Sequence, residues 1–192
     1  MVDLQLLLLG AYIVGSIPTG YLFAYAGGIH DIRRHGSGNI GATNVARILG
    51  AHYFVPVFVI DALKALLYLR MAAWYGASEP VLLGCAITVL VGNGYSLFLH
   101  FTGGKGFATV TGIMWFFKPC LTILLFCLWI TTFMLVRTVG IASATTCLGL
   151  VVSGVYLLST QTSIASAFVV MGLWGIWRHL DNIKRFLQLP ID

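Results

Sequence analysis

Residues 107–136 read FATVTGIMWFFKPCLTILLFCLWITTFMLV, and the way this stretch divides decides the fold. Lys118 and Pro119 interrupt the apolar run after eleven residues. A helix of eleven residues rises only about 17 Å, so it crosses a bilayer only where protein shelters its end. One long helix would place the C-terminal tail opposite the polar stretch at 36–47, whereas two helices would place both on one side.

The composition around this stretch is that of a membrane protein. Of 192 residues, 59% are hydrophobic and only 9% are charged, and the mean hydropathy is +0.94. A bilayer core takes roughly 20 helical residues to cross, so the length allows about six or seven spans. We therefore expect an all-α, polytopic integral membrane helix bundle that forms a single membrane domain over residues 1–192, with no soluble domain.

The apolar segments follow one another with short polar breaks between them. We expect membrane segments at about 4–26 (broken by Gly15, Pro18 and Gly20), 53–75, 81–101, 107–117, 120–136, 139–158 and 164–177. Most of the positive charge then falls on one side, which is typical of the cytoplasmic side: Arg33, Arg34, Arg47, Lys105, Arg137, Arg178, Lys184 and Arg185. Only Lys118 and Arg70 lie toward the other side. The sequence predicts seven transmembrane segments, one of them short, with the N-terminus outside and the C-terminus cytoplasmic.

The stretch GSGNIGATNVAR at 36–47 is the most polar in the chain. Its three glycines can bend the backbone and turn N–H groups toward an anion, and Arg47 adds a bidentate donor for phosphate or carboxylate. Similar breaks begin at Gly106 and Gly140, each with Ala and a hydroxyl residue after the glycine. Helix starts of this kind attract anions, although small residues also simply allow close helix packing.

The charge pattern excludes some partners. The net charge is +5, but no run of five basic residues occurs, so we expect no nucleic-acid binding. The cysteines form no CxxC pair and have no histidine at ligand spacing, so we expect no metal and no cofactor. Anionic lipid headgroups in the bilayer and anionic substrates are the partners that the charge favours.

Two further polar sets leave alternatives open. Asp61 and Lys64 lie three residues apart inside an apolar segment, where they form either a structural or a functional ion pair. In the tail, Arg178, His179 and Asn182 are spaced to line one helical face. Three roles are open for His179: a general base, a hydrogen-bond donor to phosphate, or an interfacial residue that reaches water.

Three motifs carry a resemblance to a known family. SGNIGATNVAR at 37–47, FTGGKGFAT at 101–109 and RHLDNIKR at 178–185 resemble, in order and spacing, the motifs of the bacterial acyl-phosphate:glycerol-3-phosphate acyltransferases, the PlsY family. The resemblance covers nearly the whole chain, and the DALK step at 61–64 belongs to it. None of the five histidines is followed by aspartate at the HxxxxD spacing of other glycerol-phosphate acyltransferases.

The resemblance implies a seven-helix enzyme of phospholipid biosynthesis in the bacterial cell inner membrane, with its active site on the cytoplasmic side. It would transfer a fatty acyl group from acyl phosphate to the 1-hydroxyl of glycerol 3-phosphate, giving lysophosphatidic acid and phosphate. Carried over by position, the catalytic residues are Ser37, Arg47, Lys105, His179 and Asn182. The substrate-binding residues are Gly36, Gly38, Asn39, Gly41, Thr43, Asn44, Gly103, Gly104, Gly106 and Ser143.

Four positions depart from the family pattern. The family usually carries His at Asn93, Lys at Thr102, Ser at Gly140 and Gly at Ala65. Two alternatives therefore stand beside the acyltransferase: a divergent paralogue with a different acceptor, and a transporter or channel for phosphorylated anions, which also uses broken helices. The sequence does not indicate an oligomeric state.

Overall fold

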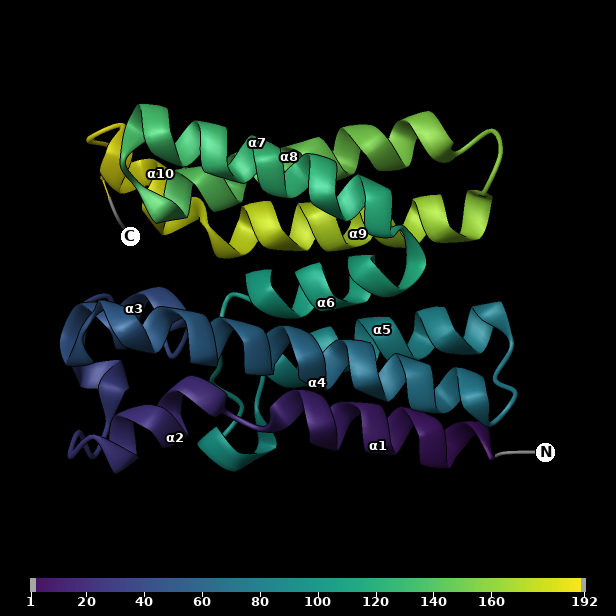
Figure 1. Cartoon of the computed structure of the whole chain (residues 1–192), viewed down its shortest axis with the longest axis horizontal. Helices are drawn as coiled ribbons and strands as arrows, with labels where there is room; N and C mark the ends of the chain where they lie inside the picture. Colours follow the sequence, from purple (N-terminus) through teal and green to yellow (C-terminus); the bar gives the residue numbers. More distant parts are fainter. Residues whose placement is uncertain (1–2, 191–192) are drawn as a thin grey trace. The chain divides into compact units, whose positions relative to one another are not determined.

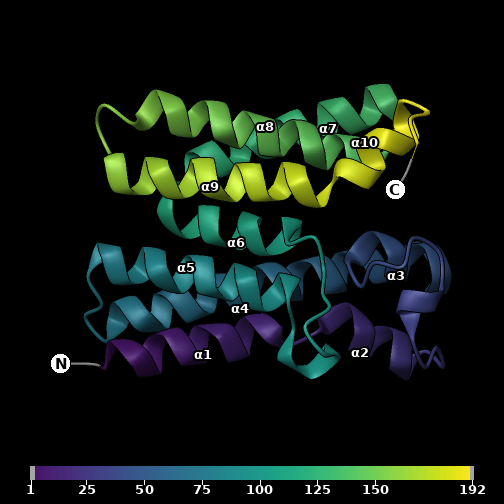
Figure 2. The same cartoon turned by 180° about the vertical axis from the view of Figure 1, so that it is seen from behind.

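A computed structural model describes residues 3–190, and these residues fold as helices joined by turns (Figures 1 and 2). Within this range no β-strand forms, and the feature most similar to a strand is an isolated antiparallel bridge between Ser96 and Thr102. The all-α fold expected from the sequence is confirmed. By its internal contacts the chain divides after Phe116 into two compact units. The single membrane domain stays a prediction.

The described part of the first unit, from residue 3 onward, holds six α-helices and three short 3₁₀ turns. In chain order they are α1 (Leu4–Ser16), α2 (Thr19–Ala26), η1 (Ile32–Arg34), α3 (Ala42–Leu49), η2 (Ala51–Tyr53), α4 (Phe54–Trp74), α5 (Glu79–Gly94), η3 (Leu97–Leu99) and α6 (Phe107–Phe117). Figures 1 and 2 place α2 and α3 at one end of this unit, and the start of α1 with the α4–α5 turn at the other.

The stretch 107–136 forms two helices, as the two-segment division predicts. Helix α6 ends at Phe117 and α7 (Pro119–Val136) begins two residues later. Lys118 between them has φ −145° and ψ 71°, outside the helical region. Pro119 opens α7, where its missing N–H has no helical partner to lose.

Among residues 3–190, three segments are long and apolar enough to cross a membrane: residues 4–26, which comprise α1 and α2, together with α7 and α8 (Val139–Leu157). Helices α5 and α6 are shorter apolar helices. Helix α4 has 21 residues, but it carries Asp61, Lys64 and Arg70. The number of spans and their orientation therefore stay predictions.

Helices α1 and α5 pack through glycines. A Cβ atom at Gly15 would lie 2.8 Å from the carbonyl carbon of Val89, and one at Gly92 would lie 2.9 Å from the backbone nitrogen of Ser16. Small residues of this kind let helix backbones approach closely in membranes. The Tyr12 hydroxyl also donates to the carbonyl of Tyr95, 2.8 Å away, at the end of α5.

The expected segment 81–101 is wrong at its C-terminal end, because α5 stops at Gly94. The chain turns there because Ser96 forms its hydrogen bonds with residues outside the helix. Its hydroxyl donates to the Ser16 carbonyl at 2.6 Å, and its N–H donates to the Thr102 carbonyl at 3.2 Å. His100 and Phe101 follow with positive φ angles of 55° and 59°, which are incompatible with a continued right-handed helix.

A compact apolar core lies beneath α2 and α3. Its buried members are Ala24, Ile32, Ile40, Ala42, Val45, Val57 and Leu99. They come from α2, η1, the 36–47 stretch, α4 and η3, so this core packs the 36–47 stretch against α2, α4 and η3.

The second unit comprises α7, α8, α9 (Thr162–Arg178) and the short α10 (Leu180–Phe186). Helices α8 and α9 pack closely along their length (Figure 1). A Cβ at Gly154 would lie 2.9 Å from the carbonyl oxygen of Ala165, and one at Gly172 would lie 2.8 Å from that of Cys147. Here too, glycine permits the close approach.

The tail does not form the single helical face that the spacing of Arg178, His179 and Asn182 predicts. Helix α9 ends at Arg178, His179 has φ −104° and ψ 5°, and α10 begins at Leu180. The interpretation of the three residues as one face is therefore wrong. His179 sits at the corner between two helices.

Candidate functional site

The 36–47 stretch is a glycine-shaped loop that runs into α3. Gly36 and Gly38 have positive φ angles of 61° and 72°, a conformation that L side chains rarely adopt. Gly41 is the N-cap residue of α3, and its carbonyl accepts from the N–H groups of Asn44 and Val45. The prediction that this break opens a helix is confirmed, as it is for Gly106 before α6 and for Gly140 in the first turn of α8.

Asn44 holds the loop together from inside. Its side chain is 1% exposed. Its Oδ1 accepts from the backbone N–H of Ser37 at 2.8 Å and from Arg47 Nη1 at 3.2 Å, while its Nδ2 donates to the His35 carbonyl at 2.9 Å. One side chain therefore fixes the backbone at Ser37 and the guanidinium of Arg47 together.

The second polar loop, 102–106, is fitted against the end of α5. The Gly104 N–H donates to the Asn93 carbonyl at 2.9 Å. A Cβ at Gly103 would lie 2.6 Å from the carbonyl carbon of Gly94, so only glycine fits there without displacing backbone. This packing sets the position of Lys105, which follows directly and is partly exposed.

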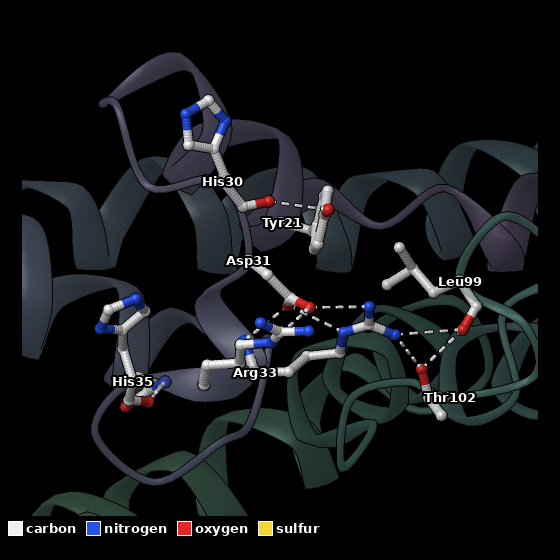
Figure 3. Close-up of polar contacts among 9 residues, drawn as sticks. Tyr21, His30, Asp31, Arg33, His35, Leu99 and Thr102 are labelled. Atoms are coloured by element: carbon white, nitrogen blue, oxygen red, sulfur yellow. Dashed lines mark hydrogen bonds and ion pairs between the residues drawn. The ribbon is translucent and has the colours of Figure 1, made fainter.

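Arg33 lies in η1, just before the first loop, and its side chain contacts the second loop (Figure 3). Its Nη1 donates to the Thr102 hydroxyl at 2.8 Å and to the Leu99 carbonyl at 3.3 Å. Its Nε and Nη2 form a bidentate pair with the Asp31 carboxylate, both at 2.9 Å. This bidentate geometry is the strongest arrangement of an arginine with a carboxylate. The sequence analysis counted Arg33 only among the positive charges of the predicted cytoplasmic side, although the Asp31-x-Arg33 spacing was a signal for the pair.

Charge and hydrogen bonding in this pair reinforce one another. The side-chain hydrogen bond from Arg33 lowers the pKa of Asp31 from 3.8 to about 2, and the same pairing raises the pKa of Arg33. Arg33 also lies over the Tyr21 ring, 5.7 Å from its centroid, and the Tyr21 hydroxyl donates to the His30 carbonyl (Figure 3). Asp31 is thus held as a carboxylate at neutral pH, and the guanidinium is fixed against Thr102 of the second loop.

Beneath the loops, Asp61 and Lys64 form the buried ion pair that their spacing predicts. Lys64 Nζ lies 2.7 Å from Asp61 Oδ1, which also accepts from the Thr19 hydroxyl at 2.8 Å. Lys64 further donates to the Ile17 carbonyl at 2.9 Å, at the break between α1 and α2. A non-helical carbonyl at membrane depth needs such a donor. These contacts favour the structural alternative for the pair.

In the second unit, Asn182 lies against the start of α8. A Cβ at Gly140 would lie 2.5 Å from Asn182 Cγ, so the glycine leaves the space that the Asn182 side chain fills. Ser143, one turn further along α8 and 3% exposed, accepts from the indole N–H of Trp129 at 3.2 Å.

His179 is 4% exposed, which rules out the alternative of an interfacial residue that reaches water. Its Nδ1 lies 2.7 Å from the Gly175 carbonyl. Because a carbonyl only accepts, Nδ1 carries the proton in the neutral ring, and Nε2 is then the nitrogen with the lone pair. This is the tautomer that a base acting at Nε2 requires.

The structure brings the sequence-derived residues of the first unit together in two loops. The first loop and its N-cap supply Gly36, Ser37, Gly38, Asn39 and Gly41, and the start of α3 supplies Thr43, Asn44 and Arg47. The second loop supplies Gly103, Gly104, Lys105 and Gly106. Ser143, His179 and Asn182 belong to the second unit. Four positions depart from the family pattern. Asn93 contacts the second loop, Thr102 belongs to that loop and accepts from Arg33, Gly140 leaves space for Asn182, and Ala65 is fully buried in α4.

The chain matches known proteins over almost its full length. The family model for glycerol-3-phosphate acyltransferase matches residues 5–189. A glycerol-3-phosphate acyltransferase of Thermus thermophilus is 39% identical over 181 residues, which cover 94% of this chain and 90% of that protein.

Solved structures of PlsY, an integral membrane glycerol 3-phosphate acyltransferase, share the fold as well. The glycerol 3-phosphate form superposes with a TM-score of 0.87 at 34% identity, covering 96% of this chain and 92% of that one. The lysophosphatidic acid form gives a TM-score of 0.84 at 33% identity, with the same coverage of both chains. Together with the apolar helices, these matches identify an integral membrane protein, and the chain belongs to the glycerol-3-phosphate acyltransferase family.

Proposed function

We propose that this protein transfers a fatty acyl group from acyl phosphate to the 1-hydroxyl of glycerol 3-phosphate, giving lysophosphatidic acid and inorganic phosphate. Membership of the glycerol-3-phosphate acyltransferase family supports the acceptor, because two solved relatives are described as glycerol 3-phosphate and lysophosphatidic acid forms. The donor rests on the resemblance of the three motifs. The transporter alternative has no comparable support.

The observation that carries the proposal is the pairing of two glycine loops in one compact unit. The first loop leads into α3, which carries Arg47, and the second loop carries Lys105. The loops are neighbours, because a Cβ atom at Gly104 would lie 3.6 Å from Ile40 Cγ1. Both substrates are phosphate anions that repel one another. Two cations on glycine-rich loops offset this repulsion and orient the substrates, which is the main requirement for a reaction with a good leaving group.

The chemistry needs no covalent intermediate on the protein. Acyl phosphate is a mixed anhydride, so the 1-hydroxyl oxygen attacks its carbonyl carbon directly. The bond from that carbon to the phosphate oxygen then breaks, and inorganic phosphate leaves with the electron pair. By the motif resemblance, the hydroxyl proton goes to His179 or to a phosphate oxygen of the substrate, and hydroxyl and amide donors stabilise the oxyanion. The same proposal places the reaction on the cytoplasmic side of the bacterial inner membrane.

The test is product formation by the purified protein from palmitoyl phosphate and labelled glycerol 3-phosphate. We expect lysophosphatidic acid, with none from palmitoyl-CoA offered in parallel. Arg47→Ala and Lys105→Ala should each abolish transfer. Arg34→Ala is the matched control, because the Arg34 side chain is 85% exposed and its nearest ionic contact is a long one, 3.9 Å, with Asp31.

Near-normal activity in both Arg47→Ala and Lys105→Ala would overturn the assigned site. Product from palmitoyl-CoA alone would overturn the donor. Uptake of labelled glycerol 3-phosphate into proteoliposomes without product would support the transporter in place of the enzyme.

A further inference from the structure

Asn93 joins the buried ion pair to the loop that carries Lys105. It lies next to last in α5 and is 7% exposed. Its side-chain Oδ1 accepts from Lys64 Nζ at 3.0 Å, and its backbone carbonyl accepts from the Gly104 N–H at 2.9 Å. A single residue therefore faces the ammonium group on one side and the loop on the other.

The Lys64 ammonium fixes which way the Asn93 amide points. An ammonium group has three N–H donors. Lys64 Nζ has three acceptors within 3.0 Å: Asp61 Oδ1 at 2.7 Å, the Ile17 carbonyl at 2.9 Å and Asn93 Oδ1 at 3.0 Å. An amide NH₂ facing the ammonium would replace an acceptor by a donor. The amide oxygen must therefore face Lys64, and Nδ2 is directed elsewhere.

Nδ2 is directed toward the second loop. A Cβ atom at Gly104 would lie 3.2 Å from Asn93 Nδ2, so the amide nitrogen lies against the Gly104 α-carbon with no side chain between them. Within residues 3–190, Nδ2 has no hydrogen-bond acceptor. It is also not fully buried, in contrast to Thr109 Oγ1, which is buried and has no partner. The nitrogen thus presents two N–H donors beside Lys105, the neighbour of Gly104.

We propose that Asn93 is a further substrate-binding residue, whose Nδ2 donates to a phosphate oxygen of the substrate held at the 103–106 loop. Lys64 is then a positioning residue, because it acts by orienting this amide. The assignment rests on the proposed function, which brings two phosphate-bearing substrates to the loops. A hydrogen bond to a charged acceptor is stronger than a neutral one, so this donor adds to the attraction of Lys105.

Asn93→Asp tests the donor. The carboxylate keeps an acceptor for Lys64 and removes the N–H groups, and its charge opposes a phosphate. We expect the KM of one substrate, acyl phosphate or glycerol 3-phosphate, to rise about tenfold or more with kcat changed far less. The substrate whose KM rises identifies which phosphate Asn93 contacts. Thr88→Val is the control, because the Thr88 hydroxyl on the same helix donates only to the Gly84 carbonyl.

Asn93→Ala separates the lost donor from the added charge, and it serves if Asn93→Asp does not fold. It should raise the same KM by a smaller factor, about three to tenfold. Unchanged KM values for both substrates in either folded variant would overturn the assignment. So would a rise that occurs only in Asn93→Asp, because repulsion alone would then explain it.

A protein that forms no product at all would overturn the proposed function and not the role of Asn93. Inorganic phosphate then tests Asn93 by itself. Phosphate should raise the thermal unfolding midpoint of the wild type and of Thr88→Val, and raise it less in Asn93→Ala. Equal stabilisation of all three proteins by phosphate would overturn the assignment.

Discussion

At the scale of single residues, the candidate site depends on side chains that hold loops rather than on side chains that face outward. Asn44 uses both ends of its amide within the first loop, so it orders the catalytic candidates Ser37 and Arg47. The sequence marked Asn44 as a substrate ligand because of its motif. That role stays a prediction, and the structure adds a reason for asparagine that does not need the substrate.

Replacing Asn44 with alanine should lower activity at least about tenfold. The change leaves the Ser37 N–H and the His35 carbonyl without their partner and frees Arg47, and each unpartnered buried group costs about 1–3 kcal/mol. Initial rates at saturating palmitoyl phosphate measure the loss. Ser166→Ala, which removes an exposed hydroxyl on α9, is the control and should keep wild-type activity. Wild-type rates in Asn44→Ala would contradict the role in ordering the loop.

The Asp31–Arg33 pair makes a prediction about pH. Because the folded-state pKa of Asp31 is depressed from 3.8 to about 2, the pair contributes stability that is fully present above the unfolded value. This contribution is lost as the pH falls from about 4 toward 2. The difference in unfolding midpoint between wild type and Asp31→Asn should therefore be constant from about pH 5 to 8 and shrink below about pH 4.

Thr102→Val provides the contrast in the same experiment. This substitution removes the Thr102 hydroxyl that accepts from Arg33 and leaves the Asp31–Arg33 pair intact. The difference in unfolding midpoint between wild type and Thr102→Val should therefore not shrink at low pH. A difference for Asp31→Asn that persists unchanged down to pH 2 would contradict the pairing.

At the scale of elements, glycines decide how closely helices approach. Gly92 and Gly84 lie on the same helix, α5, but a Cβ at Gly92 would meet the α1 backbone at 2.9 Å, whereas one at Gly84 would meet only Leu8 Cδ2 at 3.4 Å. Gly92→Ala should therefore lower the thermal unfolding midpoint in detergent, at a cost of about 1–3 kcal/mol from overpacking. Gly84→Ala should leave it equal or raise it, because alanine favours helix. Equal midpoints in the two variants would contradict this contact.

Apolar segments and their breaks could be predicted from sequence because length, Pro and charge determine them locally. The division at Lys118 and Pro119 and the pairing of Asp61 with Lys64 are examples. The end of α5 could not be predicted from sequence, because it depends on a hydrogen bond between Ser96 and Ser16, eighty residues earlier. The helix break at His179 could not be predicted either, because the spacing of Arg178, His179 and Asn182 is that of one continuous helix. The contacts that Arg33 makes with Thr102 and that Asn93 makes with Lys64 were missed because they join residues far apart in the chain.

At the scale of the whole molecule, the charge distribution still predicts seven spans with the N-terminus outside. Cysteine labelling tests this with single cysteines in a variant whose four native cysteines are replaced by alanine. We choose the exposed positions His35 and Gln188 for the predicted cytoplasmic side, and Ser78 and Thr160 for the outside. An impermeant maleimide added to intact cells should modify Ser78→Cys and Thr160→Cys, and reach His35→Cys and Gln188→Cys only after permeabilisation. The predicted topology has an even number of spans between His35 and Gln188, so both positions should lie on the same side. If His35→Cys and Gln188→Cys were labelled from opposite sides, the number of spans between them would be odd. That result would contradict two separate crossings by α6 and α7. Since that result would place RHLDNIKR on the other face from the loops of Arg47 and Lys105, the labelling pattern also decides whether His179 can belong to the same chemistry.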